Sequence, residues 1–346
     1  WTFVKYFHTF LLIHLFLLQE FANYLKSFFV NLKNMPKEWK EIEFSVPYGS
    51  IRGKAWGDAS DDEKCLKFLA LHGWQDNAGT YDEVIPLLNF DCYVLAIDLP
   101  GHGLSSHLPA GVPYTDYQYT IEIRKIVDHL GWKKYSFMGH SMGGMIALFF
   151  ASFYPDEVQM VVCLDVLKPL TCDANSIAEN VAKNVNTFTN IETKLKPSIR
   201  AYTYQEAINR MMEAHSIFGN ITEKGARALL RRGAKQIDGD KFVFTRDIRL
   251  RSLVFTRYTG DCLKAFFSRF KCDILILMAK SGVKHDNEDV KNEFLDVYAK
   301  CAKYFKYIEV DGEHHIHLYD AKAIVPHINE FVSRLNFSDG LKNGHH

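Results

Sequence analysis

The chain has 346 residues, of which 47% are apolar and 24% are charged, and this composition is that of a folded globular protein. The 41 Lys and Arg residues balance the 41 Asp and Glu residues, so the formal net charge is zero. The sequence therefore gives no electrostatic reason to expect binding to nucleic acid or to an anionic membrane. Its seven cysteines include no C-x-x-C pair, which favours reduced thiols in an intracellular protein.

Residues 1–34 form an apolar leader, rich in Phe and Leu, ahead of the first methionine, Met35. Its longest run without a charged residue is too short to span a bilayer comfortably, and no small-x-small cleavage site follows it. We expect an optional or non-native leader, with a signal-like segment or a membrane anchor as the alternative. The expected location is accordingly the cytoplasm or the peroxisome, or a secreted or membrane-anchored form if the leader is functional.

From residue 41 the sequence alternates between strand-like and helix-like segments. An alternating pattern around a Pro-Tyr-Gly-Ser turn predicts a β-hairpin over residues 41–57. Short apolar runs predict four parallel strands, over residues 65–71, 91–97, 133–141 and 158–167. Helices are predicted between them, over residues 80–88, 119–130 and 142–154. This order predicts a mostly parallel sheet with helices on both faces.

The alternation stops at Lys168 and resumes near residue 266. The segment 168–265, called the insertion below, is more polar and mostly helical in pattern, with one short extended piece expected within 240–250. After it the pattern predicts a strand, a helix, a strand and a closing helix, over residues 272–280, 287–302, 304–310 and 324–335. We therefore predict an α/β core made of residues 35–167 and 266–346, with a helical cap over 168–265 inserted after the sixth strand.

A G-x-S-x-G motif, Gly139 to Gly143, lies between a predicted strand and a predicted helix. This context is typical of a nucleophile elbow, a tight turn that exposes the serine hydroxyl at the end of a sheet. Ser141 is therefore the predicted nucleophile. The alternative is a close-packed glycine turn in which Ser141 only caps the helix. The backbone N–H groups of Met142 and Trp74 are the predicted oxyanion hole. Trp74 lies in the segment 72–77 after the first parallel strand, called the oxyanion loop below.

A nucleophilic serine needs a base, and the segment after the last predicted strand offers three histidines. His314 is the predicted base because it directly follows the strand and Gly312, and His315 is the second choice. A histidine cluster also suits a metal ion, but no acid and histidine set with metal-site spacing recurs elsewhere, so neither a metal nor a cofactor is predicted.

The acid that orients the base has two candidates. Asp165 ends the strand before the insertion, and Asp286 lies in the loop after the strand 272–280. Both preserve the chain order Ser, Asp, His. The position where such an acid commonly lies carries Ser281 or Gly282 instead. We favour Asp165, because it requires no rearrangement of a loop.

Substrate contacts are predicted for His72 and His140, near the oxyanion loop and the serine, and for Met211 and Met212 of the insertion. Further apolar residues of the insertion are candidates for the same pocket: Tyr202, Tyr204, Phe218 and Phe255. Met and aromatic side chains adapt to varied ligand shapes. The alternative is that these residues form the insertion's own core.

Four segments, in the order "LHGWQDNAGTYDEVIPLL", "AIDLPGHGLSS", "GHSMGGMIA" and "GEHHIHL", resemble the α/β-hydrolase superfamily over about residues 38–336. Within the insertion, "KPSIRAYTYQEAINRMMEAH", "ITEKGARALLRRG" and "FVFTRDIRLR" resemble the capped group of serine hydrolase-like proteins. Epoxide hydrolases and haloalkane dehalogenases are relatives of this group and use an aspartate as nucleophile. Because this chain has Ser141 there, the resemblance implies ester-type acyl chemistry.

We therefore expect a serine hydrolase that cleaves a small apolar carboxylic ester or a related acyl derivative through an acyl-enzyme. One alternative is hydrolysis of a thioester or a carbon–carbon bond by the same residues. The other is a ligand-binding protein that keeps the fold and turns over slowly or not at all. The sequence predicts no partner beyond such a substrate and leaves the oligomeric state open.

Overall fold

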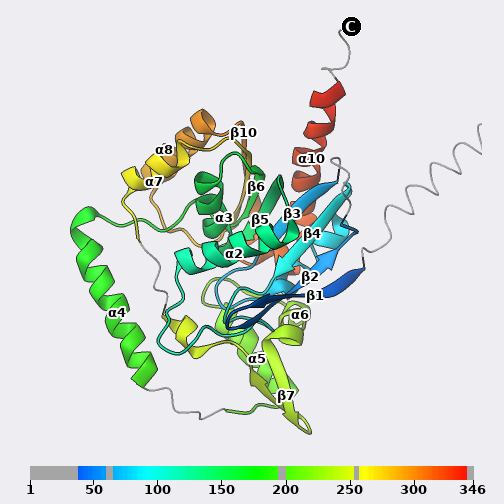
Figure 1. The fold of residues 1–346 in the computed structure, drawn as a ribbon, viewed down its shortest axis with the longest axis vertical. Coiled ribbons are helices and arrows are strands. Elements are labelled where there is room, and N and C mark those ends of the chain that lie inside the picture. The colour runs from blue at the N-terminus through cyan, green and yellow to red at the C-terminus, as the bar shows by residue number, and fades with distance from the viewer. Residues whose placement is uncertain (1–37, 60–64, 194–199, 253–256, 341–346) are drawn as a thin grey trace, which may run out of the picture. The chain divides into compact units, whose positions relative to one another are not determined.

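An eight-stranded, mostly parallel β-sheet forms the centre of the protein (Figure 1). The structure, a computed structural model, describes residues 38–59, 65–193, 200–252 and 257–340. The predicted leader over residues 1–34 and the predicted pocket residue Phe255 lie outside these ranges. Within the described ranges, no helix combines the length and the apolar character that crossing a membrane requires.

The strand order in the sheet is β1-β2-β4-β3-β5-β6-β9-β10. β2 runs antiparallel to its neighbours β1 and β4, and the remaining neighbours run parallel. The strands span Trp39–Val46 (β1), Gly49–Trp56 (β2), Leu66–Leu71 (β3), Cys92–Ile97 (β4), Tyr135–His140 (β5), Val158–Leu164 (β6), Asp273–Ser281 (β9) and Tyr304–Glu313 (β10). Strands β1 and β2 form the predicted hairpin. The predicted α/β fold class is thus confirmed.

The helices cover both faces of the sheet because alternate residues of each strand point to opposite sides. In β3, Leu69 and Leu71 pack on one face, together with residues of α2, α3, α7 and α8. Phe68 and Ala70 pack on the other face, against α10 and the short helices η1 and η2. The helices of these two layers span Asp116–Leu130 (α2), Met142–Phe153 (α3), Gly260–Phe267 (α7), Glu288–Cys301 (α8), Ile316–Tyr319 (α9) and Ala321–Gly340 (α10).

The helix predicted over residues 80–88 differs in the structure. Two short 3-10 helices, Ala78–Tyr81 (η1) and Ile85–Leu87 (η2), take its place. Pro86 lies inside η2, and a proline has no N–H to donate to an α-helical ladder. The chain consequently makes two short turns here instead of one continuous α-helix.

Between β6 and β9 the chain leaves the sheet and forms helices and a small hairpin (Figure 1). Its elements span Ala174–Ser176 (η3), Ile177–Thr193 (α4), Tyr204–His215 (α5), Glu223–Gly233 (α6), Ala234–Asp238 (β7), Lys241–Phe244 (β8) and Ile248–Arg251 (η4). The expected short extended piece is therefore one strand of an antiparallel pair, β7 with β8. Residues of α5 and α6 share a separate apolar cluster that includes Ile208 and Leu229.

Candidate active site

Ser141 occupies a strained turn between β5 and α3. Its backbone has φ 49° and ψ −117°, a region that residues with a side chain rarely adopt. The turn needs glycine at Gly143, because a Cβ atom there would lie 2.0 Å from the carbonyl oxygen of Leu71. Ser141 is half-buried and directly precedes the N-terminus of α3, whose free N–H groups and dipole favour negative charge. This is the geometry of a nucleophile elbow.

His314 and Asp165 come from the ends of two different strands and form a buried pair. His314 directly follows β10, and Asp165 directly follows β6. The Nδ1 atom of His314 lies 2.5 Å from Oδ2 of Asp165, and the other carboxylate oxygen of Asp165 accepts a 2.7 Å hydrogen bond from the N–H of Ala279. The carboxylate is therefore held on both sides and fixes the orientation of the imidazole ring.

The second candidate acid, Asp286, does not contact His314 in this way. It pairs instead with Lys168, with 2.8 Å between Nζ and the carboxylate, and the Lys168 side chain is 1% exposed. The structure also gives a reason for glycine at the position where an acid was expected. A Cβ atom on Gly282 would lie 2.4 Å from both carboxylate oxygens of Asp165. The loop after β9 therefore packs directly on Asp165 and leaves no room for a side chain.

The predicted oxyanion loop lies beside Ser141 because β3 and β5 are neighbours and pair in parallel, Leu71 with Gly139. Trp74 follows β3, and its indole Nε1 donates a 2.7 Å hydrogen bond to the carbonyl of Leu250 in the insertion. Met142 is the first residue of α3. The predicted donors Trp74 and Met142 thus come from two segments that meet at the serine.

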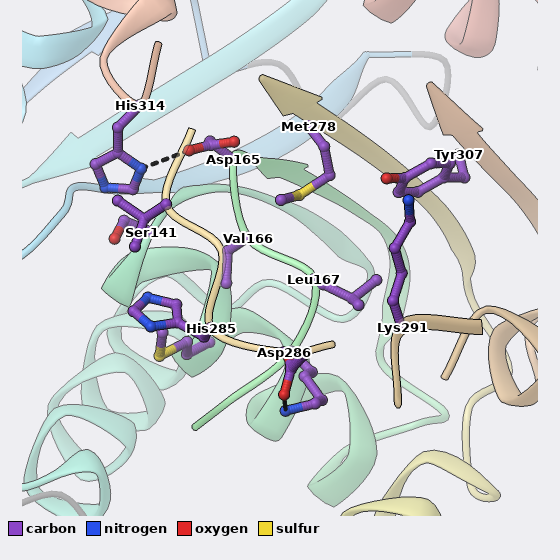
Figure 2. Close-up of a pocket in the computed structure, with 13 residues that line it drawn as sticks. Ser141, Asp165, Val166, Leu167, Met278, His285, Asp286, Lys291, Tyr307 and His314 are labelled. Atoms are coloured by element: carbon purple, nitrogen blue, oxygen red, sulfur yellow. Dashed lines mark hydrogen bonds and ion pairs between the residues drawn. The ribbon is translucent and has the colours of Figure 1, made fainter. Parts of the chain in front are cut away.

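Two cavities adjoin the serine, and both are lined by Ser141 and His314. Figure 2 shows one of them, with Ser141 next to the His314 ring and the His314–Asp165 contact beyond it. The apolar side chains of the other cavity are Trp74, Met142, Met145, Leu170, Phe218 and Val283. Of the insertion residues predicted to line a pocket, Phe218 does so here.

The positions of three predicted substrate contacts differ from the expectation. His72 is fully buried, with Nδ1 2.7 Å from the carbonyl of Gly73 and Nε2 accepting a 3.0 Å hydrogen bond from the N–H of Leu99. It supports the loop and does not line either cavity at Ser141. Met211 and Met212 pack in the apolar cluster of the insertion, as the alternative interpretation held. His140 does line the apolar cavity.

Several cavity residues were missed by the sequence analysis. Leu170, Val283 and His285 follow β6 and β9 and face the serine from the neighbouring loops. Burial lowers the pKa of His285. These positions share one signal, because ligand sites of parallel sheets lie beyond the carboxyl ends of the strands. Because these residues belong to no motif, they can be recognised only once the ends of the strands are known.

Buried imidazoles and a carboxylate gather on the inner side of this site, at Asp76, His140, His314, His315 and His317. Two trios among them have ligand atoms within 4.8 Å of one another: His140 with His314 and His315, and Asp76 with His140 and His317. Burial raises the pKa of Asp76 to about 7 and lowers that of His317 to about 3. Burial also lowers the pKa of His140 and of His315, so these two histidines and His317 are held in the neutral form.

Comparison with known proteins identifies relatives of this chain and proteins of the same fold. A family model described as alpha/beta hydrolase fold matches residues 68–194. A serine hydrolase-like protein of Danio rerio is 35% identical over 86% of this chain and 90% of that protein. A probable serine hydrolase of Drosophila melanogaster is 32% identical over 85% of this chain and 88% of that protein. A crystal structure of a hypothetical protein from Pseudomonas aeruginosa covers 85% of this chain and 99% of its own, with a TM-score of 0.71 and 24% identity, and shows the same fold.

Proposed function

This chain belongs to the α/β-hydrolase family and to its group of serine hydrolase-like proteins, and on this premise we propose that it cleaves small apolar carboxylic esters or related acyl derivatives through an acyl-enzyme. The observation that carries the proposal is the pair of His314 and Asp165 beside a serine on a strained turn. Nucleophile, base and acid come from three separate segments and meet at a shared cavity.

The first half of the reaction forms an ester with the enzyme. Asp165, when ionised, only accepts, so Nδ1 of His314 carries the proton in their hydrogen bond and Nε2 has a free lone pair. Nε2 takes the proton of Ser141 as its Oγ attacks the substrate carbonyl. The N–H groups of Met142 and Trp74 stabilise the oxyanion. His314 then returns the proton to the departing alkoxide, which leaves as the alcohol.

The second half releases the acid. A water molecule gives a proton to Nε2 of His314 and attacks the acyl carbonyl, and the same backbone donors hold the second oxyanion. Collapse of this intermediate expels Ser141, which regains its proton from His314. The apolar walls at Trp74, Phe218 and Leu170 favour a small apolar acyl group, because burying such a group removes apolar surface from water.

A fluorophosphonate probe tests the proposal against the alternative of a binding protein with little turnover. We expect the full chain to be labelled and Ser141→Ala to lose the label while keeping its thermal unfolding midpoint. A panel of ester and thioester substrates of increasing acyl length then separates these two reactions. A folded protein that takes up no probe and hydrolyses none of the panel would contradict the proposal.

The two candidate acids give a matched pair of variants. We expect Asp165→Asn to lower kcat by about 10⁴-fold, because His314 then loses its correct tautomer. Asp286→Asn should change kcat by less than about tenfold, because Asp286 pairs with Lys168. Equal effects in the two variants would mean that Asp165 does not act through His314.

A further inference from the structure

Near the nucleophile, three residues each have one deeply buried polar atom that has no hydrogen-bond partner among the residues that the structure describes. These atoms are Oδ2 of Asp76, Nδ1 of His140 and Nδ1 of His317. The three residues are 4%, 1% and 0% exposed, and each offers a ligand atom within 4.8 Å of those of the other two. Buried polar atoms in native proteins nearly always have a partner. Three neighbouring side chains that each have such an atom therefore indicate a shared partner.

The remaining polar atoms of these side chains are occupied. Oδ1 of Asp76 accepts a 3.0 Å hydrogen bond from the N–H of Asn77, and Nε2 of His317 lies 2.7 Å from the hydroxyl of Thr80. Nε2 of His140 lies 3.0 Å from the carbonyl oxygen of His314. Because a carbonyl only accepts, this nitrogen carries the proton and Nδ1 presents a lone pair.

Such an arrangement is characteristic of metal ligands. A histidine that binds a metal usually donates its second ring N–H to a carbonyl, carboxylate or water, which fixes the tautomer and the ring orientation. Here a backbone carbonyl, a backbone N–H and a threonine hydroxyl hold the three side chains, and each keeps one atom free.

We propose that Asp76, His140 and His317 form a binding site for one divalent transition-metal ion. Two imidazoles and one carboxylate favour a transition metal over Mg²⁺ or Ca²⁺, and the ligand set suits Zn²⁺. An ion can reach the site from the apolar cavity, because Asp76 and His140 line that cavity together with Ser141. The residues are 64 and 177 positions apart in sequence, so no local spacing reveals the site.

The ion would join three segments of the proposed active site. Asp76 lies in the oxyanion loop two residues after Trp74, His140 directly precedes Ser141, and His317 lies three residues after His314. A metal at this position would link the segments that carry the proposed nucleophile, the oxyanion loop and the proposed base. The inference concerns ion binding and does not rest on the proposed reaction.

The second trio, with His314 and His315 in place of Asp76 and His317, is the competing location. Within the described part of the chain neither ring nitrogen of His315 has a hydrogen-bond partner, so no such contact orients that ring as a ligand. The trio with Asp76 has every side chain oriented by a second contact, which favours it.

Direct binding tests the site. The full chain is treated with a chelator, dialysed and titrated with Co²⁺, whose visible absorption reports its ligands, and Zn²⁺ is then added in competition. We expect one ion per chain, and a higher thermal unfolding midpoint with Zn²⁺ because the ion binds the folded state. The proposal would be overturned if the Co²⁺ spectrum with protein were the same as in buffer alone. It would also be overturned if the ion bound without changing the thermal unfolding midpoint.

Four variants locate the ion. Asp76→Asn and His317→Gln each remove a ligand and should weaken binding by more than about 100-fold, whereas Thr80→Val removes only a support of His317 and should cost about 10–100-fold. His315→Gln is the matched control and should bind as the wild type does. Loss of binding in His315→Gln with retention in His317→Gln would assign the ion to the other trio. If both ligand variants fail to fold, Thr80→Val decides, and unchanged binding there contradicts the proposal.

Discussion

The surroundings of Asp165 place its carboxylate against His314, a contact that its position in the sequence leaves open. Both Asp165 and Asp286 follow strands at the same end of the sheet, and the sequence gives only a slight preference for Asp165, because the choice depends on how two loops pack. Gly282 against the Asp165 carboxylate and Lys168 against Asp286 are contacts between distant segments. The strained turn at Ser141, in contrast, could be predicted from a local motif between a strand and a helix.

His72 is a second residue whose position in the fold differs from the expectation. The sequence predicts a substrate contact for His72 because of its place beside Trp74. In the structure both of its ring nitrogens bind the backbone. Its burial lowers its pKa to about 4, below the value of about 6.5 expected in the unfolded chain.

This difference predicts a loss of stability in acid. Between about pH 6.5 and pH 4 the unfolded state binds a proton that folded His72 refuses, so the free energy of unfolding falls as the pH falls through this range. From about pH 7.5 to about pH 5 we expect the wild type to lose roughly 2 kcal/mol more than His72→Asn. Urea unfolding at the two pH values measures this, with His129→Asn, at an exposed position, as the control. An equal pH dependence of wild type and His72→Asn would contradict it.

At the scale of elements, the strands and helices of the core could be predicted because each has a clear apolar period. The segments 65–71, 133–141 and 158–167 coincide closely with β3, β5 and β6. Two elements were described incompletely. Pro86 divides the helix expected over 80–88. Of the hairpin, only the β8 segment was expected to be extended, because β7 is mostly exposed and polar, so its sequence lacks the apolar alternation of a half-buried strand.

The contact between α3 and the end of β3 gives a prediction at this scale. Gly143→Ala would place a methyl group 2.0 Å from the carbonyl oxygen of Leu71, so α3 must shift away from the strand. We expect a loss of about 1–3 kcal/mol in the free energy of unfolding, as for other overpacked positions, measured by denaturant titration. Gly260→Ala is the control, because no atom of the described residues lies within 4 Å of the added methyl group. A neutral effect at Gly143 would mean that the approach of α3 is looser than described.

At the scale of the whole molecule, the insertion is attached to the core through a buried charge network. Arg232 of α6 contacts both carboxylate oxygens of Asp98, at 3.1 and 3.0 Å, and also pairs with Glu41 of β1 at 2.7 Å. Asp98 is fully buried. Nothing in the sequence indicated this pairing, because 134 residues separate Arg232 from Asp98.

Removing the arginine should therefore destabilise the protein strongly. Arg232→Leu leaves the Asp98 carboxylate buried without its cation, and we expect a loss of about 3–5 kcal/mol in the free energy of unfolding. The neighbouring Arg231 has a side chain that is 65% exposed and is 3.6 Å from Asp82, so Arg231→Leu should change stability by less than about 1 kcal/mol. Similar effects of the two variants would show that Asp98 is not dependent on its partner.

The indole of Trp74 and the amide of Asn77 both donate to carbonyls of the insertion, those of Leu250 and Leu229. For protein engineering, this makes the insertion more than an exchangeable lid. A chimaera that took this segment from a relative to acquire a new specificity would have to reproduce two backbone carbonyl positions as well as a new pocket wall. Grafts that alter only side chains leave these two anchors intact, and they are the safer route to redesign.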